Sequence, residues 1–499
     1  MSRQNEQWSS RWGFIAASMG MAIGTGNIWR FPRVAASNGG GPFLIAWTVA
    51  LFVWAIPLLM GEMVMGRKTG LGTIGAFRDF VGKKFTWMGT WIAAVCLAIM
   101  FYYSVIMGWC MKYFTLAVSG AFKSGMGTEA TEAIWHTFTT TPSQTIFFHF
   151  ISMTIAGIII YKGVNGGIEK ASKIMIPTLF ILMLTAVIRS VTLPGATKGL
   201  EYLFSPKLYM LKNPKIWLEA FTQAAWSTGA GWGFIITYAV YTKKKEDIAA
   251  NCMIMGFGNN VGSLIAGLTI LPAIFALSPN QEFVNQAITS GNTGLAFIYL
   301  AQLFPTMPAG RILAAIFFLS MTIAALSSLL PMIEVGVRNL MDMGMTRKKA
   351  TLLIIISGFI LGIPSAYSLD FLNNQDFVLG IGLLVSGLFV AFALMKYGLE
   401  EIRNKVINTE WTDMKVGKWW SVCVKLFPLF FIVLTGWWMF QAVGWYPDSW
   451  WNPLEVYSPG TILFQFVIYV ILGLKTNNIL AGRIGKGRDI TQLSTREVR

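Results

Sequence analysis

Residues 20–32, with the sequence GMAIGTGNIWRFP, could bind a cation and a carboxylate inside a membrane. They lie in an apolar stretch long enough to cross a bilayer, yet their glycines, Asn27 and Pro32 disfavour a continuous helix. Backbone freed from helical hydrogen bonds at membrane depth is tolerated where it is buried in protein or lines a cavity. Its carbonyl groups could coordinate a cation, and amides at a half-helix N-terminus could bind a carboxylate. The segment therefore predicts neighbouring sites for a sodium ion and an anionic solute.

A second segment, residues 223–241, has the same character, because Gly229, Gly231 and Gly233 interrupt another apolar span. This is the sixth predicted span along the chain, whereas residues 20–32 belong to the first. Two glycine-broken helices at corresponding places in two five-helix halves are typical of an inverted repeat with a binding site near the midplane. Close helix packing through small residues is the alternative explanation.

The composition indicates an integral membrane protein: of 499 residues, 55% are hydrophobic and 12% are charged, and the mean hydropathy is +0.57. A formal charge of +16 would suggest nucleic-acid binding in a soluble protein. Here the basic residues lie between apolar segments, as loop residues facing anionic lipid do. We therefore expect membrane lipid, and no nucleic acid, as a partner. The four cysteines have no metal-site spacing, which predicts reduced thiols.

Twelve stretches have the length and apolarity of membrane spans. They cover residues 13–35, 42–65, 86–118, 146–162, 172–192, 216–241, 248–277, 309–342, 350–367, 376–398, 419–444 and 458–474. Loops rich in Lys and Arg alternate with poorer loops, which places the rich loops and both termini in the cytoplasm. We expect a multi-pass protein of the plasma (inner) membrane. Its expected units are a cytoplasmic N-terminus, a first repeat, an extracellular connection, a second repeat, helices 11 and 12 and a cytoplasmic tail, with bounds 1–12, 13–192, 193–215, 216–398, 399–474 and 475–499.

Five motifs occur in order along the chain: GTGNIWRFP at 24–32, NGGGPF at 38–43, YYSVIMGW at 102–109, GWGFIITYAVY at 231–241 and FLNNQDF at 371–377. With them, spans 1–10 resemble the neurotransmitter:sodium symporter family, in its prokaryotic amino-acid transporter type. The resemblance implies an all-α membrane protein with about twelve helices. It further implies a 5+5 inverted repeat with broken helices 1 and 6, followed by helices 11 and 12. The implied activity is sodium-coupled import of a neutral amino acid by alternating access, with no catalytic residues.

Two sodium sites follow from the resemblance. The first would use Ala22, Asn27, Ser227 and Asn259 together with the substrate carboxylate. The second would use the carbonyls of Gly20, Ile23 and Ala324 and the hydroxyls of Ser327 and Ser328. Neutral oxygens suit a weakly held monovalent ion, whereas Mg²⁺ and Ca²⁺ sites usually recruit carboxylates. Taken alone, the two serines would equally fit helix-interior hydroxyls bonded to the preceding turn.

The substrate site implied by the resemblance comprises Ala22, Gly24, Thr25, Gly26, Ile99, Tyr103, Trp226, Ser227, Gly229, Trp232 and Met332. Amides of Thr25 and Gly26 and the hydroxyl of Tyr103 would bind a carboxylate, and carbonyls of the broken helices would take an ammonium. Monoamine-transporting relatives have an aspartate where this chain has Gly24, so the substrate is expected to bring its own carboxylate. A small or medium neutral amino acid is predicted. Ordinary packing remains the alternative explanation for the two tryptophans.

A chloride ion is the further ion that the resemblance suggests. Chloride-independent relatives carry an acid four residues after the helix-7 asparagine, and that position here is Ser263. No Asp or Glu occurs between residues 251 and 280. The implied chloride site comprises Trp47, Gln223, Ser227, Asn259 and Ser263, where chloride-binding relatives have tyrosine in place of Trp47. Polar helix-packing residues would give the same pattern.

Gates and a hinge also match the family. The outer gate would pair Arg30 with Asp376, the inner gate would involve Tyr241 and Asp342, and the hinge would lie between Gly167 and Pro177. A loop boundary with Pro in the first turn would explain the last pair equally well. The family's N-terminal arginine is Asn5 here, and Arg3 is the candidate replacement. Glu62 and Glu334 are expected to be protonated or paired structural acids.

Other classes fit less well. A channel would need a continuous polar pore or a filter repeat, whereas this chain has discrete polar clusters. A membrane enzyme would need a His or Cys nucleophile or a metal cluster, and the only histidines, His136 and His149, are expected to be unpaired and near the external face. The motif G-x-x-x-x-G-K-[ST] is absent, so no nucleotide partner is expected. A symporter for a non-α amino acid remains open.

Overall fold

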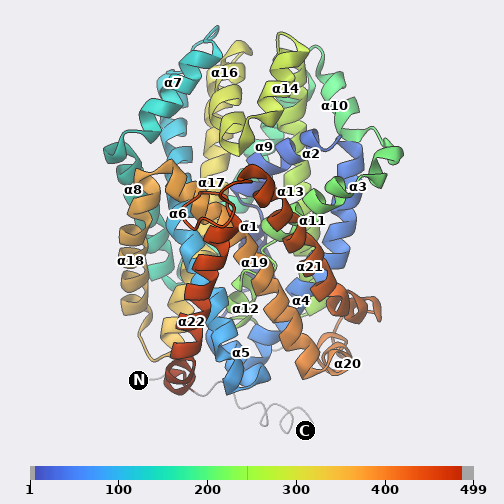
Figure 1. Cartoon of the computed structure of the whole chain (residues 1–499), viewed down its shortest axis with the longest axis vertical. Coiled ribbons are helices and arrows are strands. Elements are labelled where there is room, and N and C mark those ends of the chain that lie inside the picture. The colour runs from blue at the N-terminus through green and yellow to red at the C-terminus, as the bar shows by residue number, and fades with distance from the viewer. Residues whose placement is uncertain (1–5, 244, 486–499) are drawn as a thin grey trace.

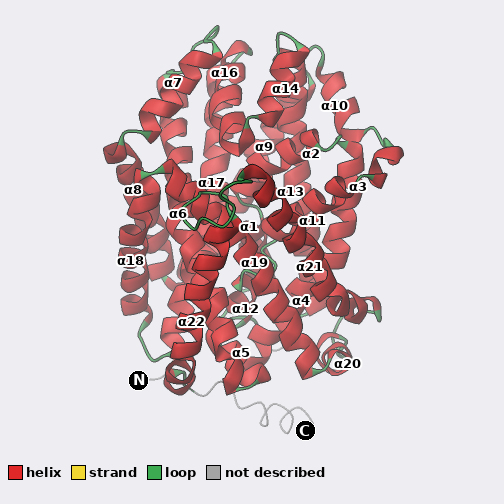
Figure 2. Ribbon diagram, in the orientation of Figure 1, coloured by secondary structure: helices red, strands yellow, loops and turns green. Residues whose placement is uncertain are grey.

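The computed structural model describes residues 6–243 and 245–485, so Arg3 and Asn5 lie outside the described residues. Within these ranges the chain is helical, with loops between helices and no strand (Figure 2). Ten of the described helices are long and apolar enough to cross a membrane. They correspond in order to ten of the twelve predicted spans. The two remaining spans are the first and the sixth, the two that the glycine pattern predicts to be broken.

The uninterrupted spans carry the labels of Figure 1. They are α3 (Gly41–Ala50) with α4 (Ile56–Thr69), α6 (Thr86–Ser119), α8 (Pro142–Tyr161), α9 (Lys170–Val191), α13 (Ile248–Leu277), α17 (Gly310–Asp342), α18 (Arg347–Tyr367), α19 (Leu369–Tyr397), α21 (Trp419–Trp445) and α22 (Pro459–Arg483). Most of these helices extend beyond the predicted ends. For example, α19 begins at Leu369 rather than at 376, because Ser368 caps it by accepting a hydrogen bond from Phe371 N.

The first span is divided into α1 (Arg11–Ala22), the π-helical turn η1 (Gly26–Arg30) and α2 (Phe31–Ser37). Helical geometry stops at Ile23, where φ is −83° and ψ is 87°. The interruption releases backbone groups at the level of Gly24, at the depth where the sequence predicts ligand binding.

The sixth span is divided into α11 (Pro214–Ser227) and α12 (Phe234–Ala239). Gly229, Gly231 and Gly233 all have positive φ, at 75°, 86° and 76°. Residues with a Cβ adopt this region only at a cost, so the three alternating glycines determine where the helix unwinds. Glu62 on α4 compensates for part of the loss, because its Oε1 accepts a hydrogen bond of 3.1 Å from Gly233 N.

Short helices cover the two ends of the bundle (Figure 1). At one end lie α7 (Thr128–Thr139), α10 (Ala196–Phe204), α14 (Gln281–Thr289) and α16 (Leu300–Leu303), and at the other lie α5 (Thr73–Val81) and α20 (Leu399–Ile402). The basic loops belong to the second end, which the charge pattern predicts to be cytoplasmic. We call the two ends outer and inner.

Candidate functional site

A cavity of about 440 Å³ joins the two helix breaks to the outer end of the molecule. Ten of the eleven predicted substrate-site residues lie on its wall: Ala22, Gly24, Thr25, Gly26, Tyr103, Trp226, Ser227, Gly229, Trp232 and Met332. Ile99 does not, and it is fully buried. Because α6 runs from the inner to the outer end, Ile99 lies one turn deeper than Tyr103, and the wall continues outward through Ile106 and Trp109.

The polar part of the cavity is built around the Tyr103 hydroxyl. Its oxygen accepts hydrogen bonds from Thr25 N at 3.2 Å and from Thr25 Oγ1 at 3.0 Å. Both bonds use the oxygen as acceptor, so the hydroxyl proton stays available for donation into the cavity. A Cβ built on Gly26 meets no described atom within 4 Å, so the backbone there borders open space. This arrangement can receive a carboxylate beside η1.

The proposed ligands of the first sodium ion meet at Asn27. Its Oδ1 accepts from Gly24 N at 3.0 Å, and its Nδ2 donates to Asn259 Oδ1 at 2.7 Å. That Asn259 atom also lies 3.2 Å from the Ala22 carbonyl oxygen and 2.8 Å from the Ser227 carbonyl oxygen. Assigned as oxygen, it accepts from Asn27 but faces two other acceptors, an arrangement that a cation among the three oxygens would relieve. Assigned as nitrogen, it would satisfy the carbonyls but face a second donor.

Oxygens from α1 and α17 meet at the proposed second sodium site. Ser327 Oγ is 3.4 Å from the Ile23 carbonyl oxygen and 2.9 Å from that of Ala324. Ser328 Oγ is 3.4 Å from the Gly20 carbonyl oxygen. The two contacts between helices are longer than a strong O–H···O bond. The oxygens are therefore brought together without being tightly bonded to one another, as ligands around an ion would be.

Three of the five proposed chloride-site residues are close together, whereas the other two have different surroundings. Ser263 Oγ is 2.8 Å from Asn27 Nδ2, and Asn259 Nδ2 donates to Ser227 Oγ at 3.2 Å. Gln223 is engaged through its Oε1, which accepts from the Arg30 guanidinium. Trp47 packs on Phe31 with ring centroids 4.5 Å apart. Its buried Nε1 has no hydrogen-bond partner among the described residues.

The predicted outer gate is not closed. Arg30 and Asp376 both line the cavity, but no ion pair joins them in the described chain. Arg30 instead donates to Gln223 Oε1 at 2.7 Å, and Asp376 Oδ1 accepts from the Tyr102 hydroxyl at 3.0 Å. The expected pair is not formed in this conformation, in which the two side chains border a cavity that is open to the outer end, and gating by this pair stays a prediction.

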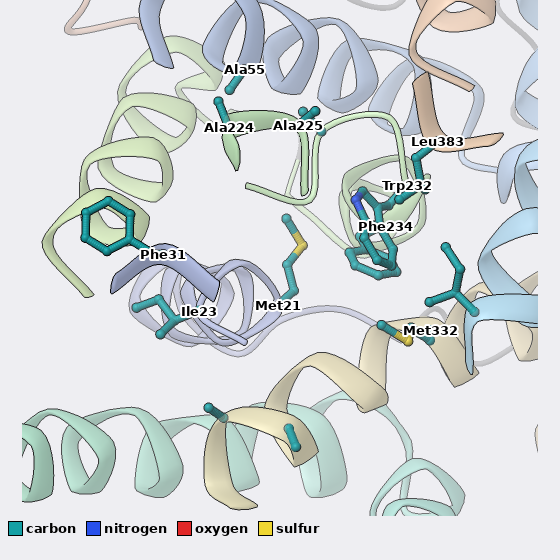
Figure 3. Close-up of a cluster of buried hydrophobic side chains, with 14 of the residues drawn as sticks. Met21, Ile23, Phe31, Ala55, Ala224, Ala225, Trp232, Phe234, Met332 and Leu383 are labelled. Carbon is teal, nitrogen blue, oxygen red and sulfur yellow. The ribbon is translucent and has the colours of Figure 1, made fainter. Parts of the chain in front are cut away.

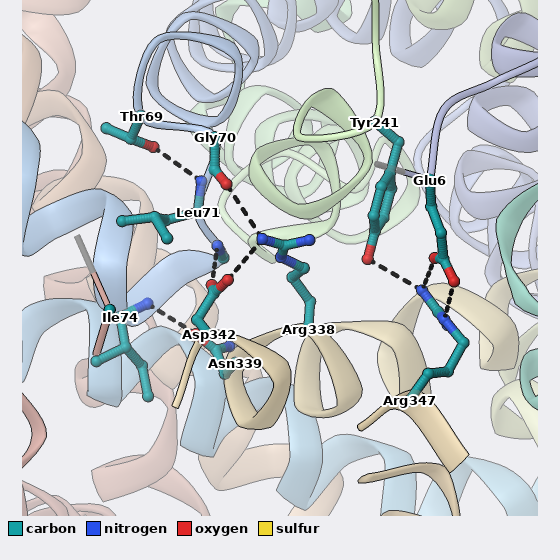
Figure 4. Close-up of polar contacts among 12 residues, drawn as sticks. Glu6, Thr69, Gly70, Leu71, Ile74, Tyr241, Arg338, Asn339, Asp342 and Arg347 are labelled. Atoms are coloured by element: carbon teal, nitrogen blue, oxygen red, sulfur yellow. Dashed lines mark hydrogen bonds and ion pairs between the residues drawn. The ribbon is translucent and has the colours of Figure 1, made fainter. Parts of the chain in front are cut away.

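The inner end is closed by a network of charged and aromatic groups (Figure 4). The Tyr241 hydroxyl donates to Glu334 Oε1 at 2.5 Å. Arg347 donates to both oxygens of Glu334 and pairs with Glu6 at 2.5 Å. Glu334 is thus a paired acid, as the sequence predicts. The sequence reasoning does not identify Glu6 or Arg347 as part of this network. Arg347 is explained there as a basic loop residue by the positive-inside rule, and no pattern links Glu6 to it.

The other predicted inner-gate residue, Asp342, does not contact Tyr241 through any hydrogen bond described here. It pairs with Arg338 at 2.6 Å and accepts a bond of 2.7 Å from Gly72 N. The Arg338 guanidinium carbon lies 5.5 Å from the centre of the Tyr241 ring, so it connects the two predicted residues. The cavity is therefore open to the outer end and separated from the inner end by ion pairs.

The predicted hinge coincides with an irregular turn. Residues Val164–Glu169 form a π-helical turn, η4, before α9, and Pro177 lies inside α9. A Cβ on Gly167 would lie 2.0 Å from the Ile159 carbonyl oxygen, so close packing alone requires glycine there. Glu169 accepts a hydrogen bond of 2.8 Å from Ser9 N, which joins this turn to the start of α1. The hinge role itself stays a prediction.

Comparison with known proteins adds a family assignment. The model of the sodium:neurotransmitter symporter family matches residues 5–142 and 139–472. An uncharacterized sodium-dependent transporter of Methanocaldococcus jannaschii is 31% identical over 84% of this chain and 87% of its own length. An uncharacterized sodium-dependent transporter of Bacillus subtilis is 32% identical over 81% of this chain and 92% of its own. The crystal structure of MhsT in complex with L-phenylalanine superposes with a TM-score of 0.73, at 29% identity, and covers 86% of this chain and 99% of MhsT.

Proposed function

The chain belongs to the sodium:neurotransmitter symporter family, and from this premise we propose that it imports a small or medium neutral amino acid by alternating access. Sodium-coupled symport by a multi-pass membrane protein that is not an enzyme follows from membership itself. The amino-acid substrate and the individual binding residues are our proposal. The observation that carries it is the meeting of both helix breaks, with Gly24, Gly26 and the Tyr103 hydroxyl, in one cavity.

Gly24 supports an amino acid over a monoamine. A substrate amine without a carboxylate would need an acid from the protein, and no acidic side chain lies on the cavity wall beside the breaks within the described residues. Asp376, the one acid on that wall, belongs to the outer part. An amino acid supplies its own carboxylate, which the amides near Gly26 and the Tyr103 hydroxyl can bind. MhsT was crystallised with such a molecule, L-phenylalanine.

The transport cycle that we propose alternates between the inner closure seen in this structure and an outer closure that is not formed here. Two sodium ions bind at the C-terminal end of α1, and the substrate carboxylate completes the first site. The outer end of the cavity then closes, and Arg30 approaches Asp376. Opening of the inner network around Arg347, with weakening of the turn before α9, releases the cargo to the cytoplasm. Ion pairs at each end are suited to this role because water can replace either partner when the helices separate.

Orientation and organisation belong to the same proposal. The basic loops put both termini in the cytoplasm and the molecule in the plasma (inner) membrane. Residues 13–192 and 216–398 form the two repeats, with 193–215 as the outer connection. The alternative of a channel is less well supported, because the inner network interrupts any continuous pore. A symporter for a non-α amino acid would use the same sodium sites. Its substrate would differ only in how deep the carboxylate lies in the cavity.

The direct test is uptake by the purified full chain in proteoliposomes. A labelled neutral amino acid, chosen from a binding screen of all twenty in sodium buffer, should accumulate only with an inward sodium gradient. Dissipating the gradient with a sodium ionophore should abolish accumulation. A channel would conduct without accumulating its solute, so equal final concentrations inside and outside would contradict the symport of amino acids.

Chloride should stimulate this uptake. Near the first site, the sodium ion and the substrate ammonium carry two positive charges, and the substrate carboxylate supplies only one negative charge. A further anion would offset the remaining positive charge at low dielectric. We expect faster initial uptake in chloride than in gluconate at constant sodium, and chloride-independent uptake in Ser263→Glu. Ser263→Ala is the matched control, since it changes the same buried position without adding charge. Equal wild-type rates in the two anions would refute the site.

A further inference from the structure

The innermost part of the cavity is an apolar pocket that contains a buried, unpaired hydrogen-bond donor. Trp226, Trp232, Phe234, Met21 and Met332 form its walls. The Trp232 ring packs against Phe234 with centroids 5.0 Å apart and edge-on to Trp226 at 5.9 Å. Figure 3 shows Met21, Trp232 and Met332 arranged around this space. The pocket lies where the side chain of the proposed amino acid would sit, so the inference rests on the proposed function.

Trp232 is only 4% exposed, yet its Nε1 has no hydrogen-bond partner among the described residues. Some of the other buried indoles in the described residues are satisfied. Trp8 Nε1 donates to the Tyr238 carbonyl at 3.0 Å, and Trp420 Nε1 donates to the Pro57 carbonyl at 3.0 Å. A buried donor is costly when unpaired, so the cavity itself is the place to look for the acceptor.

Three further buried indoles are also unpaired, and their positions set Trp232 apart. Trp47 and Trp54 are away from the cavity wall. Trp109 is on the wall, but in the outer part, where its ring lies edge-on to Trp135 at 5.0 Å and 87°. Trp232 is thus the unpaired indole of the inner pocket.

The Trp232 donor faces the side of the pocket that the proposed substrate side chain would fill. In Figure 3 the nitrogen-bearing edge of the ring is turned toward the side of Met21 and away from Leu383. Gly229 adds no side chain here, and a Cβ on it would lie only 3.3 Å from both Met21 Cε and Phe234 Cδ2. A substrate side chain that enters between Met21 and Met332 would reach the N–H after the neighbouring side chains shift, because Nε1 has almost no exposed surface in the described residues.

We propose that Trp232 sets substrate specificity by donating a hydrogen bond to the substrate side chain. The preferred class is neutral amino acids whose side chain carries an uncharged acceptor, such as a hydroxyl or amide oxygen. The N–H has almost no exposed surface and no partner before substrate binds, and a hydrocarbon side chain would leave it unpaired, whereas a side chain with an acceptor would pair it. A site with a buried donor therefore discriminates against the isostere that lacks the acceptor. Charged side chains are disfavoured because none of the five residues that form the pocket walls is charged.

The test compares isosteric pairs: threonine with valine, and asparagine with leucine. Each unlabelled amino acid competes with a labelled reference ligand for the purified full chain in sodium buffer. At least one acceptor-bearing member should bind about tenfold or more tightly than its hydrocarbon partner, a ratio expected for one unpaired buried donor. In Trp232→Phe the ratio should fall to about one, mainly through weaker binding of the acceptor-bearing member.

Two controls separate a specific role from general damage. Trp109→Phe removes an unpaired indole from the outer part of the wall and should keep the ratio. Substitution of Trp232 by benzothienylalanine keeps the shape of the ring and removes only the N–H, so it decides the result if the phenylalanine variant binds nothing. Equal affinities within both wild-type pairs, or a ratio that survives either change at Trp232, would overturn the proposal. Absence of any sodium-dependent amino-acid binding would instead refute the proposed function.

Discussion

Gly24→Asp should abolish amino-acid uptake. The new carboxylate would lie beside the amides and the Tyr103 hydroxyl that are proposed to bind the substrate's own carboxylate. Two like charges about 4 Å apart repel by about 4 kcal/mol at an effective dielectric constant of about 20. This energy corresponds to a loss of roughly a thousandfold in affinity. Initial uptake of the labelled substrate at saturating sodium is the measurement.

Gly24→Ala is the control that this experiment requires, because the site is crowded. A Cβ at position 24 would lie 2.6 Å from Ser328 Oγ and 2.9 Å from the Tyr103 hydroxyl oxygen. The Ser328 hydroxyl can rotate away at some cost, whereas the Tyr103 oxygen lies on the axis of its ring and moves only with the whole side chain, so the alanine variant should lose part of its activity. The aspartate variant should lose much more. If both variants fail equally, crowding explains the result and the charge argument is wrong.

The fold could be predicted largely from the sequence, because the bilayer restricts the possibilities. Apolar stretches give the spans, and alternating glycines mark where a span must unwind. Gly229, Gly231 and Gly233 have positive φ, which explains why their pattern predicts the second break so well. Ends of helices were less accurate, since they depend on local caps such as Ser368. The assignment to the family confirms the twelve-helix arrangement.

Site residues taken from backbone motifs came together, whereas residues that act through long side chains were harder to predict. Gly26 and Asn27 are fixed by the break itself. Arg30 and Asp376 lie on different elements, so their separation depends on which end of the cavity is open. Glu6 and Arg347 form an ion pair across 341 positions of the chain, which no local pattern reveals. The unpaired Trp232 donor is likewise visible only in three dimensions.

Asn27→Ala and Ser328→Ala should each weaken sodium-dependent uptake, but through different ions. Asn27 belongs to the proposed first site, and Ser328 to the second, between α1 and α17. An oxygen that contacts a charged group contributes about 1.5–3 kcal/mol, so each variant should need roughly ten- to a hundredfold more sodium for half-maximal uptake. Ser320→Ala is the matched control, because that hydroxyl donates only within its own helix, to the Ile316 carbonyl at 2.8 Å.

Substrate should distinguish the two sites. The proposed first ion contacts the substrate carboxylate, so substrate must tighten that site, and that ion must tighten substrate binding by the same factor. In Ser328→Ala this mutual effect should persist, since the first site is intact. In Asn27→Ala it should be strongly reduced, because the amide that also holds Gly24 N and Asn259 in place is missing. Labelled-sodium binding with and without substrate measures the effect. Unchanged sodium dependence in both variants, or an equal substrate effect in both, would contradict two separate sites. A difference between them would mean that the break in α1 divides one helix end between an ion coupled to the substrate and an ion held between α1 and α17.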